Sequence, residues 1–187
     1  MSIKIGYKKL RNNLIAELEI LGDNNENRSD IVDPINAEHR CSKVRVLSIK
    51  DHDGKPYDEG NSLNDKQFIY KVGEIIETEY DKNIDKVCSS GIHYFLSYKR
   101  AKEYDMTVPK NFTGYWFDYY DNGLLKYKRQ FENGKANGLC EEWYDNGQLK
   151  HRNNSINSQL HGLAETWYED GQLKITRLYQ NGIQICN

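Results

Sequence analysis

Two segments in the N-terminal half of the chain carry cysteine and histidine, the residue types of zinc sites. His39 and Cys41 form an H-x-C pair, and Cys88 and His93 form a C-x4-H pair. Two such pairs on separate strands could supply four zinc ligands. A Cys–His nucleophile is a second chemistry for the same residues if the thiol pKa is lowered. Because free cysteine is among the most buried residue types, we favour a structural role for all four and predict no metal or other cofactor.

The elements that must position these residues are predicted to be short strands. Patterns of apolar and polar residues predict strands near 2–8, 13–21, 41–50, 68–79 and 91–97, followed by a short helix near 98–105. The segments 21–33 and 50–65 are polar and turn-rich, which predicts loops.

The C-terminal part of the chain repeats itself with a period of 24 residues. WYDNGQLK at 143–150 returns as WYEDGQLK at 167–174. Glycines in the same phase stand at 114, 138 and 162, and a second glycine follows nine residues after each, at 123, 147 and 171. The second glycine closes a turn tripeptide, and a Leu-Lys pair follows it in every copy. A phrase that returns at a fixed period indicates one small structural unit stacked on its own copies.

Each 24-residue unit is predicted to form strand, turn, strand and turn. Asn-Gly and Asp-Gly between strand-like segments are strong hairpin signals. A second turn follows at Asn133-Gly134 and Asn181-Gly182, with Asn157-Ser158 as the weaker middle copy. Since a lone hairpin is marginal in water, the six or so short strands of three units must pack against one another.

Aromatic residues recur in the repeat in two adjacent columns. Tyr119, Trp143 and Trp167 form one column, and Tyr120, Tyr144 and Tyr168 form the next. Successive residues of a strand point to opposite faces, so the two columns should lie on opposite faces. We predict that the Trp143/Trp167 column is core and that the tyrosine column binds a partner. A structural role for the tyrosines is the alternative.

The phased glycines, aromatic residues, turns and Leu-Lys pairs of residues 113–187 resemble the membrane occupation and recognition nexus (MORN) repeat, in the variant found in antitoxin-like bacterial proteins and giant-virus proteins. The middle copy departs from its sisters, with Ser155 where they have Phe131 and Tyr179. MORN repeats have been associated with membrane lipids. Residues 113–187 hold eight Lys/Arg and nine Asp/Glu without a basic cluster, and anionic membranes attract basic clusters. We therefore predict no membrane binding.

The N-terminal segment resembles an uncharacterised domain of giant viruses and phages that is often joined to repeat arrays. The shared motifs are Y-x-V-G-E at 70–74 and C-x-x-G-I-H-x-F at 88–95, although Arg40-Cys41 stands where that family has Cys-Arg. This resemblance implies no activity. GIHYFLSYKRAKEY at 91–104 is also distantly similar to ADP-ribosyltransferases of the poly(ADP-ribose) polymerase class. Their His-Gly pair has no counterpart nearer than Gly6-Tyr7-Lys8, and no catalytic Glu is identifiable.

Charge and composition argue against several kinds of protein. With 26 Lys+Arg against 28 Asp+Glu, there is no basic excess to neutralise a phosphate backbone, so we expect no nucleic-acid binding. The N-terminus lacks the apolar core of a signal peptide, and no stretch approaches the roughly 20 apolar residues that span a bilayer. The four cysteines form no CxxC pair and no dense framework, as is typical of a reduced compartment. We expect a cytoplasmic protein, in a host cytoplasm or virion if the chain is viral.

These patterns predict a mainly β protein, with an α+β domain over residues 1–110 followed by three β-hairpin repeats over residues 111–187. The predicted function is that of a non-enzymatic interaction or scaffold protein. It would bind a protein partner through the repeat face or the open terminal edge, where two copies could also pair into a homodimer. The alternative is a small transferase-like or metal-binding N-terminal domain that the repeats deliver to a target.

Overall fold

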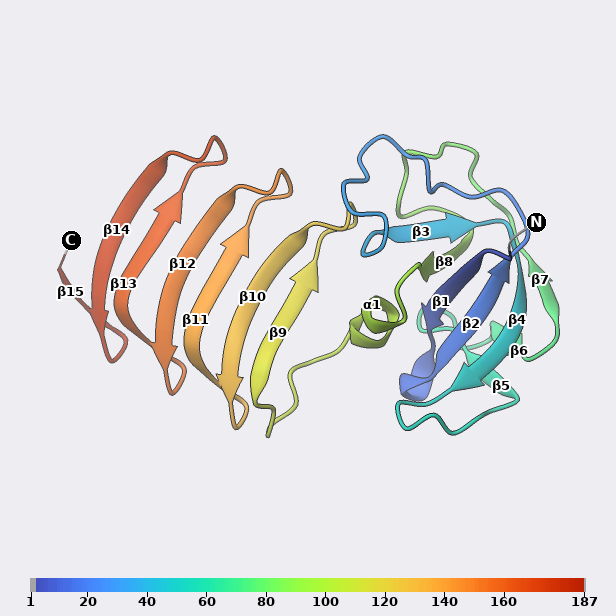
Figure 1. Cartoon of the computed structure of the whole chain (residues 1–187), viewed down its shortest axis with the longest axis horizontal. Coiled ribbons are helices and arrows are strands. Elements are labelled where there is room, and N and C mark those ends of the chain that lie inside the picture. The colour runs from blue at the N-terminus through green and yellow to red at the C-terminus, as the bar shows by residue number, and fades with distance from the viewer. Residues whose placement is uncertain (1–2, 187) are drawn as a thin grey trace. The chain divides into compact units, whose positions relative to one another are not determined.

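The computed structural model describes residues 3–186, and the chain divides into two compact units (Figure 1). The first unit comprises Met1–Asp105 together with the turn Asp121–Gly123, and the second comprises Met106–Tyr120 and Leu124–Asn187. The predicted fold class is confirmed, because strands are the main regular element of the described residues, which contain only one short α-helix. No helix in this part of the chain is long and apolar enough to cross a bilayer.

The first unit is built on a six-stranded antiparallel sheet with the strand order β3-β8-β1-β2-β4-β7. Its strands are β1 (Ile5–Lys9), β2 (Ile15–Ile20), β3 (Glu38–Cys41), β4 (Lys43–Lys50), β7 (Ile75–Glu77) and β8 (Ile92–Phe95). A 3-10 turn, Arg11–Asn13, joins β1 to β2, and the short strands β5 (Glu59–Asn61) and β6 (Ile69–Lys71) form a separate hairpin. The helix α1 (Tyr98–Glu103) begins after Ser97, whose hydroxyl accepts a hydrogen bond from the Arg100 backbone N–H, as helix N-caps do.

The sheet of the first unit buries side chains on both faces. The larger cluster gathers the inward residues of β2, β3, β4 and β8 with Leu10, Leu14 and Tyr70. The smaller cluster contains Ile15, Phe95 and Ala101, the last from α1. Since neighbouring strand residues alternate between faces, the two clusters explain why both Tyr94 and Phe95 on β8 are buried.

Buried arginines hold the loops of the first unit. Arg40 on β3 has no exposed surface. Its guanidinium donates to the backbone carbonyls of Asp81, Asn83, Lys86 and Ser90 and lies 4.6 Å from the Tyr80 ring centroid. No carboxylate is among these partners. The cation therefore acts as a hub around which residues 80–90 wrap, and its burial is compensated by carbonyl dipoles.

Two predicted strands are interrupted in the structure. The expected strand 68–79 is wrong as one element, because β6 and β7 are separated by a turn at Val72-Gly73 in which Gly73 has φ +87°. The expected strand 41–50 begins only at Lys43, since Ser42 separates β3 from β4. The predicted loop 50–65 contains the short strand β5, which the polar composition concealed.

The second unit is one antiparallel sheet of seven strands that lie side by side in chain order (Figure 1). The strands are β9 (Gly114–Tyr119), β10 (Leu125–Glu132), β11 (Lys135–Trp143), β12 (Leu149–Ile156), β13 (Gln159–Trp167), β14 (Leu173–Gln180) and β15 (Ile183–Cys186). The sequence predicted about six, and β15 adds the seventh. Within the described part of this unit only Cys140 and Ser155 are buried. The sheet is therefore a single layer whose two faces both meet solvent.

The repeated turns have the backbone that their sequences predict. Asn133, Asn157 and Asn181 have φ near +50°, at 48°, 51° and 50°, and the residue after each is also left-handed. Two successive residues with positive φ make the hairpin turn that Asn-Gly favours. In the middle copy Ser158 adopts φ +67° where its sisters have glycine, so this turn is strained for an L-residue.

Candidate functional site

The Leu-Lys pair of each repeat marks a β-bulge. Along β10 Leu125 pairs with Tyr119 and Tyr127 pairs with Asp118, which leaves Lys126 as an extra residue. The same register shift makes Lys150 and Lys174 extra in the next two repeats. A bulge re-aims the side chain it inserts. Here the three lysine Nζ atoms lie 5.7, 5.7 and 5.0 Å from the ring centroids of Tyr120, Tyr144 and Tyr168.

The tyrosine column joins one repeat to the next. The Tyr120 hydroxyl donates to the Trp143 carbonyl at 2.8 Å, and the Tyr144 hydroxyl donates to the Trp167 carbonyl at 2.9 Å. At the opposite ends of the strands, the turn amides of Gly134, Ser158 and Gly182 donate to carbonyls 22 residues earlier. Repeats are thus tied together at both ends of the strands, and these two tyrosines are part of the stacking interface.

The predicted partner-binding tyrosines differ in their exposure. Tyr120 and Tyr144 are half-buried, whereas Tyr168 in the last repeat is 50% exposed. Partner binding by this column stays a prediction. The structure shows that a lysine lies over each of its rings and that two of its three hydroxyls are engaged within the sheet.

The tryptophan column lies in a half-buried setting rather than a closed core. Trp143 and Trp167 are both half-buried, since the described residues of this unit form no second layer over the sheet. Arg152 lies 5.9 Å from the Trp167 ring centroid and forms an ion pair with Glu141 at 3.1 Å. The face that carries Trp167 is therefore partly covered by charged side chains around β12.

Apolar residues of the last described strands share this face of the repeat sheet. Leu163 is paired with Leu178, Trp167 with Leu173, and Gln180 with Ile183, so strand alternation brings these side chains to one face. Leu163 and Leu173 are each 55% exposed, and Ile183 is 70% exposed. We refer to Leu163, Trp167, Leu173 and Ile183 as the terminal patch. β15, which carries Ile183, is the outermost described strand on this side of the sheet.

The cysteines and histidines of the first unit are not brought together as a metal site. Cys41 pairs with Ile92 and His39 pairs with Tyr94, so both belong to one face of the sheet, whereas His93 pairs with Arg40 on the other. Cys88 is exposed on the loop before β8. Among residues 3–186 no three His, Cys, Asp or Glu residues lie close enough to hold a metal ion.

The thiols of the first unit also lack the features of a nucleophile. Burial raises the pKa of Cys41 to about 12, and slight desolvation together with the nearby Asp121 and Glu38 carboxylates raises the pKa of the exposed Cys88. A thiol with a raised pKa is protonated and unreactive at neutral pH. His39 is buried with Nε2 2.7 Å from the Pro34 carbonyl, and burial lowers its pKa.

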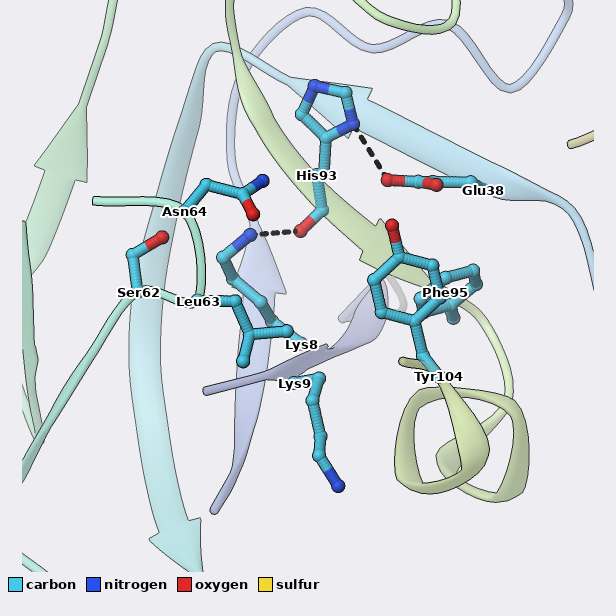
Figure 2. Close-up of a pocket in the computed structure, with 9 residues that line it drawn as sticks. All are labelled: Lys8, Lys9, Glu38, Ser62, Leu63, Asn64, His93, Phe95 and Tyr104. Atoms are coloured by element: carbon cyan, nitrogen blue, oxygen red, sulfur yellow. Dashed lines mark hydrogen bonds and ion pairs between the residues drawn. The ribbon is translucent and has the colours of Figure 1, made fainter. Parts of the chain in front are cut away.

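A polar pocket lies at the opening between β1 and β8, and the sequence did not indicate it (Figure 2). These strands pair only at Tyr7 and Phe95. Beyond that pair the link between the strands is made by a side chain: Lys8 Nζ donates a hydrogen bond to the His93 carbonyl at 2.9 Å. Glu38 Oε1 lies 2.9 Å from His93 Nδ1, and the Tyr104 ring lies on the same side of the pocket. Ser62 and Asn64 line the opposite side.

The pocket shifts the proton affinities of its ionisable groups. Burial lowers the pKa of Lys8 to about 8, against a smaller opposing effect of Glu38. The pKa of Glu38 is lowered overall, because its hydrogen bond to His93 and the nearby cations outweigh the cost of burial. Burial raises the pKa of Tyr104 to about 12. In the sequence Lys8 alternates with Gly6 and Leu10, and the structure shows both of these to be buried. This alternation is the one feature of the sequence that connects Lys8 with a buried face.

Comparison with known proteins assigns both units. Residues 136–157 and 160–181 match the MORN repeat variant, so these two repeats of the second unit are similar to MORN repeats. Residues 2–101, more than half of the chain, match a family of unknown function, DUF5758, and the chain belongs to that family.

One curated relative is similar over a short segment. The uncharacterized protein L223 of Acanthamoeba polyphaga mimivirus is 44% identical over 43 residues, which is 23% of this chain and 28% of that protein. The matched segment thus spans little more than a quarter of the relative. No solved structure matches the chain. The predicted resemblances to MORN repeats and to an uncharacterised giant-virus domain are confirmed by these matches.

Proposed function

We propose that the protein is a non-enzymatic scaffold that binds a partner protein at the end of its repeat sheet. The observation that carries this proposal is the terminal patch, an exposed apolar surface on a single-layer sheet. Exposed apolar side chains that share one face of a sheet are candidates for an interaction site. MORN-type repeats present extended surfaces of this kind, as stacked repeats do in general.

The partner that fits best is an extended apolar segment of another protein. Strand β15 is the outermost described strand on its side of the sheet, and its described residues carry no charge or proline that would protect an edge. A segment that added to this edge as a further strand would form main-chain hydrogen bonds to β15. Its alternate side chains could then cover Ile183 and the leucines of the terminal patch. Pairing of two copies through the same edge is one outcome that the test distinguishes.

The proposal is tested with a photo-crosslinking amino acid at position 173 or 183 and, as control, at position 115. Tyr115 is an exposed aromatic residue on β9, at the opposite edge of the sheet. We expect a defined crosslinked protein from positions 173 and 183 but not from position 115. Light scattering of the purified protein shows separately whether that protein is a second copy.

The binding surface is then assigned with purified partner. Leu173→Asp with Ile183→Asp should weaken binding at least about tenfold, the effect of losing a small hot spot, whereas Tyr168→Ala should leave affinity unchanged. The reverse result would place binding on the tyrosine column that the sequence predicted. Equal crosslinking from all three positions would refute a specific site at the end of the sheet.

A further inference from the structure

A second pocket of the first unit lies on the sheet face against which α1 packs, and its volume is about 210 Å³. Its lining residues are Tyr7, Ile15, Glu17, Ser48, Lys50 and Tyr98. The volume exceeds the roughly 150 Å³ of an engineered cavity that holds benzene, so a small organic molecule has room here. The site lies within the first unit and does not rest on the function proposed for the repeats.

The strand register sets the floor of this pocket. Tyr7 on β1 pairs with Glu17 on β2, and Glu17 pairs in turn with Ser48 on β4. One row further along, Ile15 pairs with Lys50. Since residues two apart on a strand share a face, all five side chains lie on one face of three neighbouring strands. The pocket is therefore built on regular elements, which hold a site more precisely than loops do.

Two tyrosine rings form a corner of the pocket. Tyr98 is the first residue of α1, and α1 packs on this face through Ala101 in the cluster with Ile15 and Phe95. The ring centroids of Tyr7 and Tyr98 lie 5.6 Å apart, and the ring planes meet at 88°. Aromatic rings placed around a site attract quaternary ammonium groups through the negative faces of the rings. Because Tyr98 is 41% exposed, this corner is open to a ligand.

Two side chains of opposite charge line the same pocket without an ionic partner. The Glu17 carboxylate accepts a hydrogen bond from the Ser48 hydroxyl at 3.1 Å. Among residues 3–186, neither Glu17 nor Lys50 forms an ion pair. Lys50 stands diagonally across from Glu17 in the register, and the backbones of such positions lie roughly 7–8 Å apart. One small ligand can therefore reach both charges.

The carboxylate lies close to the aromatic corner. Burial and the nearby Glu17 carboxylate raise the pKa of Tyr7, so the Tyr7 hydroxyl stays neutral at pH 7. Glu17 is thus the anion beside the rings, and Lys50 is the cation on the strand beyond it.

We propose that this pocket binds a betaine, a small zwitterion that carries a quaternary ammonium group and a carboxylate. The ammonium group lies between the tyrosine rings and Glu17, and the carboxylate of the ligand pairs with Lys50. A primary ammonium group is a poorer fit, because its three N–H donors need acceptors and Ser48 already occupies one oxygen of Glu17. A quaternary ammonium group donates no hydrogen bond, so ring faces and one carboxylate satisfy it.

The test is a titration of the ¹⁵N-labelled full-length protein with glycine betaine, followed by NMR chemical shifts. We expect saturable shifts at the amides of Tyr7, Glu17 and Ser48. Three comparison compounds each lack one recognised feature. In 3,3-dimethylbutanoate a carbon atom replaces the charged nitrogen, in choline a hydroxymethyl group replaces the carboxylate, and glycine lacks the methyl groups. Each should bind at least about fivefold more weakly than glycine betaine.

Variants separate the roles of the two charges. Glu17→Gln should weaken glycine betaine binding about tenfold and remove the preference over 3,3-dimethylbutanoate. Lys50→Gln should weaken the binding of glycine betaine but not that of choline. Glu19→Gln is the matched control, because Glu19 lies on the same strand outside the pocket and is ion-paired with Arg45 at 2.8 Å. It should leave both affinities unchanged.

The aromatic corner is tested by two changes at one exposed position. Tyr98→Phe keeps the ring and should keep the affinity for glycine betaine, whereas Tyr98→Leu should weaken it about fivefold. Equal affinities of the two variants would refute recognition by the ring.

Two results with the unmodified chain would overturn the proposal. One is the absence of saturable shifts on β1, β2 and β4 up to about 20 mM glycine betaine, an affinity that so small a ligand reaches even at a low efficiency per atom. The other is equal binding of glycine betaine and 3,3-dimethylbutanoate, which would mean that the pocket accepts the shape of the ligand without recognising its positive charge.

Discussion

The two units of the chain reach order by different means. In the first unit the side chains that organise the fold contact residues far away in sequence, as when Arg40 bonds carbonyls 41 to 50 residues beyond it. In the repeat sheet the hydrogen bonds that join successive repeats span only 22 or 23 residues. The first unit encloses fully buried side chains on both faces of its sheet, whereas the second buries almost none.

This difference implies different responses to mutation. A closed core fails as a whole when a central contact is removed, whereas the stability of a repeat array is close to a sum of units and interfaces. The chain allows the two responses to be observed separately. All three tryptophans, Trp116, Trp143 and Trp167, lie in the repeat unit. Cys41 is a fully buried thiol in the first unit.

Replacing Arg40 with alanine is expected to have the largest effect. It would remove the buried guanidinium that binds the backbone carbonyls of Asp81, Asn83, Lys86 and Ser90. Loss of a buried charged hydrogen-bonding hub destabilises by roughly 3–5 kcal/mol. We expect Cys41 to become reactive to a thiol reagent at far lower urea concentration, while the tryptophan fluorescence transition of the repeats stays in place.

Matched variants sharpen the Arg40 result. Arg45→Ala removes an exposed arginine whose ion pair with Glu19 is 2.8 Å long, and such pairs contribute about 0–1 kcal/mol. Arg40→Lys keeps the charge but cannot span four carbonyls, so it should fall between the two. A shift of the tryptophan transition as large as that of Cys41 would show that the units unfold together and would break the comparison.

Within the repeats, one substitution should differ in cost between equivalent turns. Gly134 and Gly182 both have positive φ and both donate to a carbonyl 22 residues earlier. A Cβ at Gly134 would overlap the Lys110 carbonyl oxygen, whereas a Cβ at Gly182 would lie 3.8 Å from Gln159. We expect Gly134→Ala to lower the free energy of unfolding by about 3 kcal/mol and Gly182→Ala by about 1 kcal/mol. Urea unfolding followed by tryptophan fluorescence measures both losses. Equal losses would contradict this steric difference.

The Lys8 amine should make the stability of the first unit depend on pH. Burial lowers its pKa from 10.5 to about 8, so the unfolded chain binds this proton more tightly than the folded chain. The free energy of unfolding should therefore rise from pH 8 towards pH 10, by roughly 1–2 kcal/mol after allowance for solvent screening of a residue that is half-buried as a whole. Lys8→Met should flatten this rise in Cys41-protection measurements, and an unchanged slope would assign it to other groups.

The contrast between periodic contacts in the repeats and long-range contacts in the first unit also explains which parts of the structure the sequence predicted. The repeat unit could be predicted because its contacts recur at the sequence period. Gly134, Lys126 and Tyr144 each stand at a position that recurs in the other repeats. The Leu-Lys pairs were recognised without the bulge that explains them. In the first unit, by contrast, Arg40 and Lys8 were not distinguished from surface cations, because only the three-dimensional surroundings make them buried. The Lys8 pocket depends on residues from β1, β3, β8 and a distant loop that no local pattern connects.

The tyrosine column tests whether the repeats act as linked neighbours. Tyr144→Phe removes the hydroxyl that donates to the Trp167 carbonyl and should cost about 1 kcal/mol, the net value of one hydrogen bond. Tyr168→Phe removes a hydroxyl for which the described residues show no such bond, so its effect on unfolding should be close to zero. Equal effects of the two changes would mean that the hydroxyl bond does not couple the repeats.

The smallest effect expected is a gain, at the one turn where the repeat departs from its pattern. Ser158 adopts φ +67° in the position that Gly134 and Gly182 occupy in the sister turns, and left-handed backbone costs an L-residue about 1–2 kcal/mol. Ser158→Gly relieves this strain. It also loses the 3.1 Å hydrogen bond that the Ser158 hydroxyl accepts from the Ala136 amide, and it makes the unfolded chain more flexible. We expect a net stabilisation of about 0.5 kcal/mol in the tryptophan-detected transition, with no change at Cys41. A loss of stability instead would show that the serine hydroxyl does more for the middle repeat than the glycine backbone does for its neighbours, and that the departure from the repeat is itself a stabilising feature.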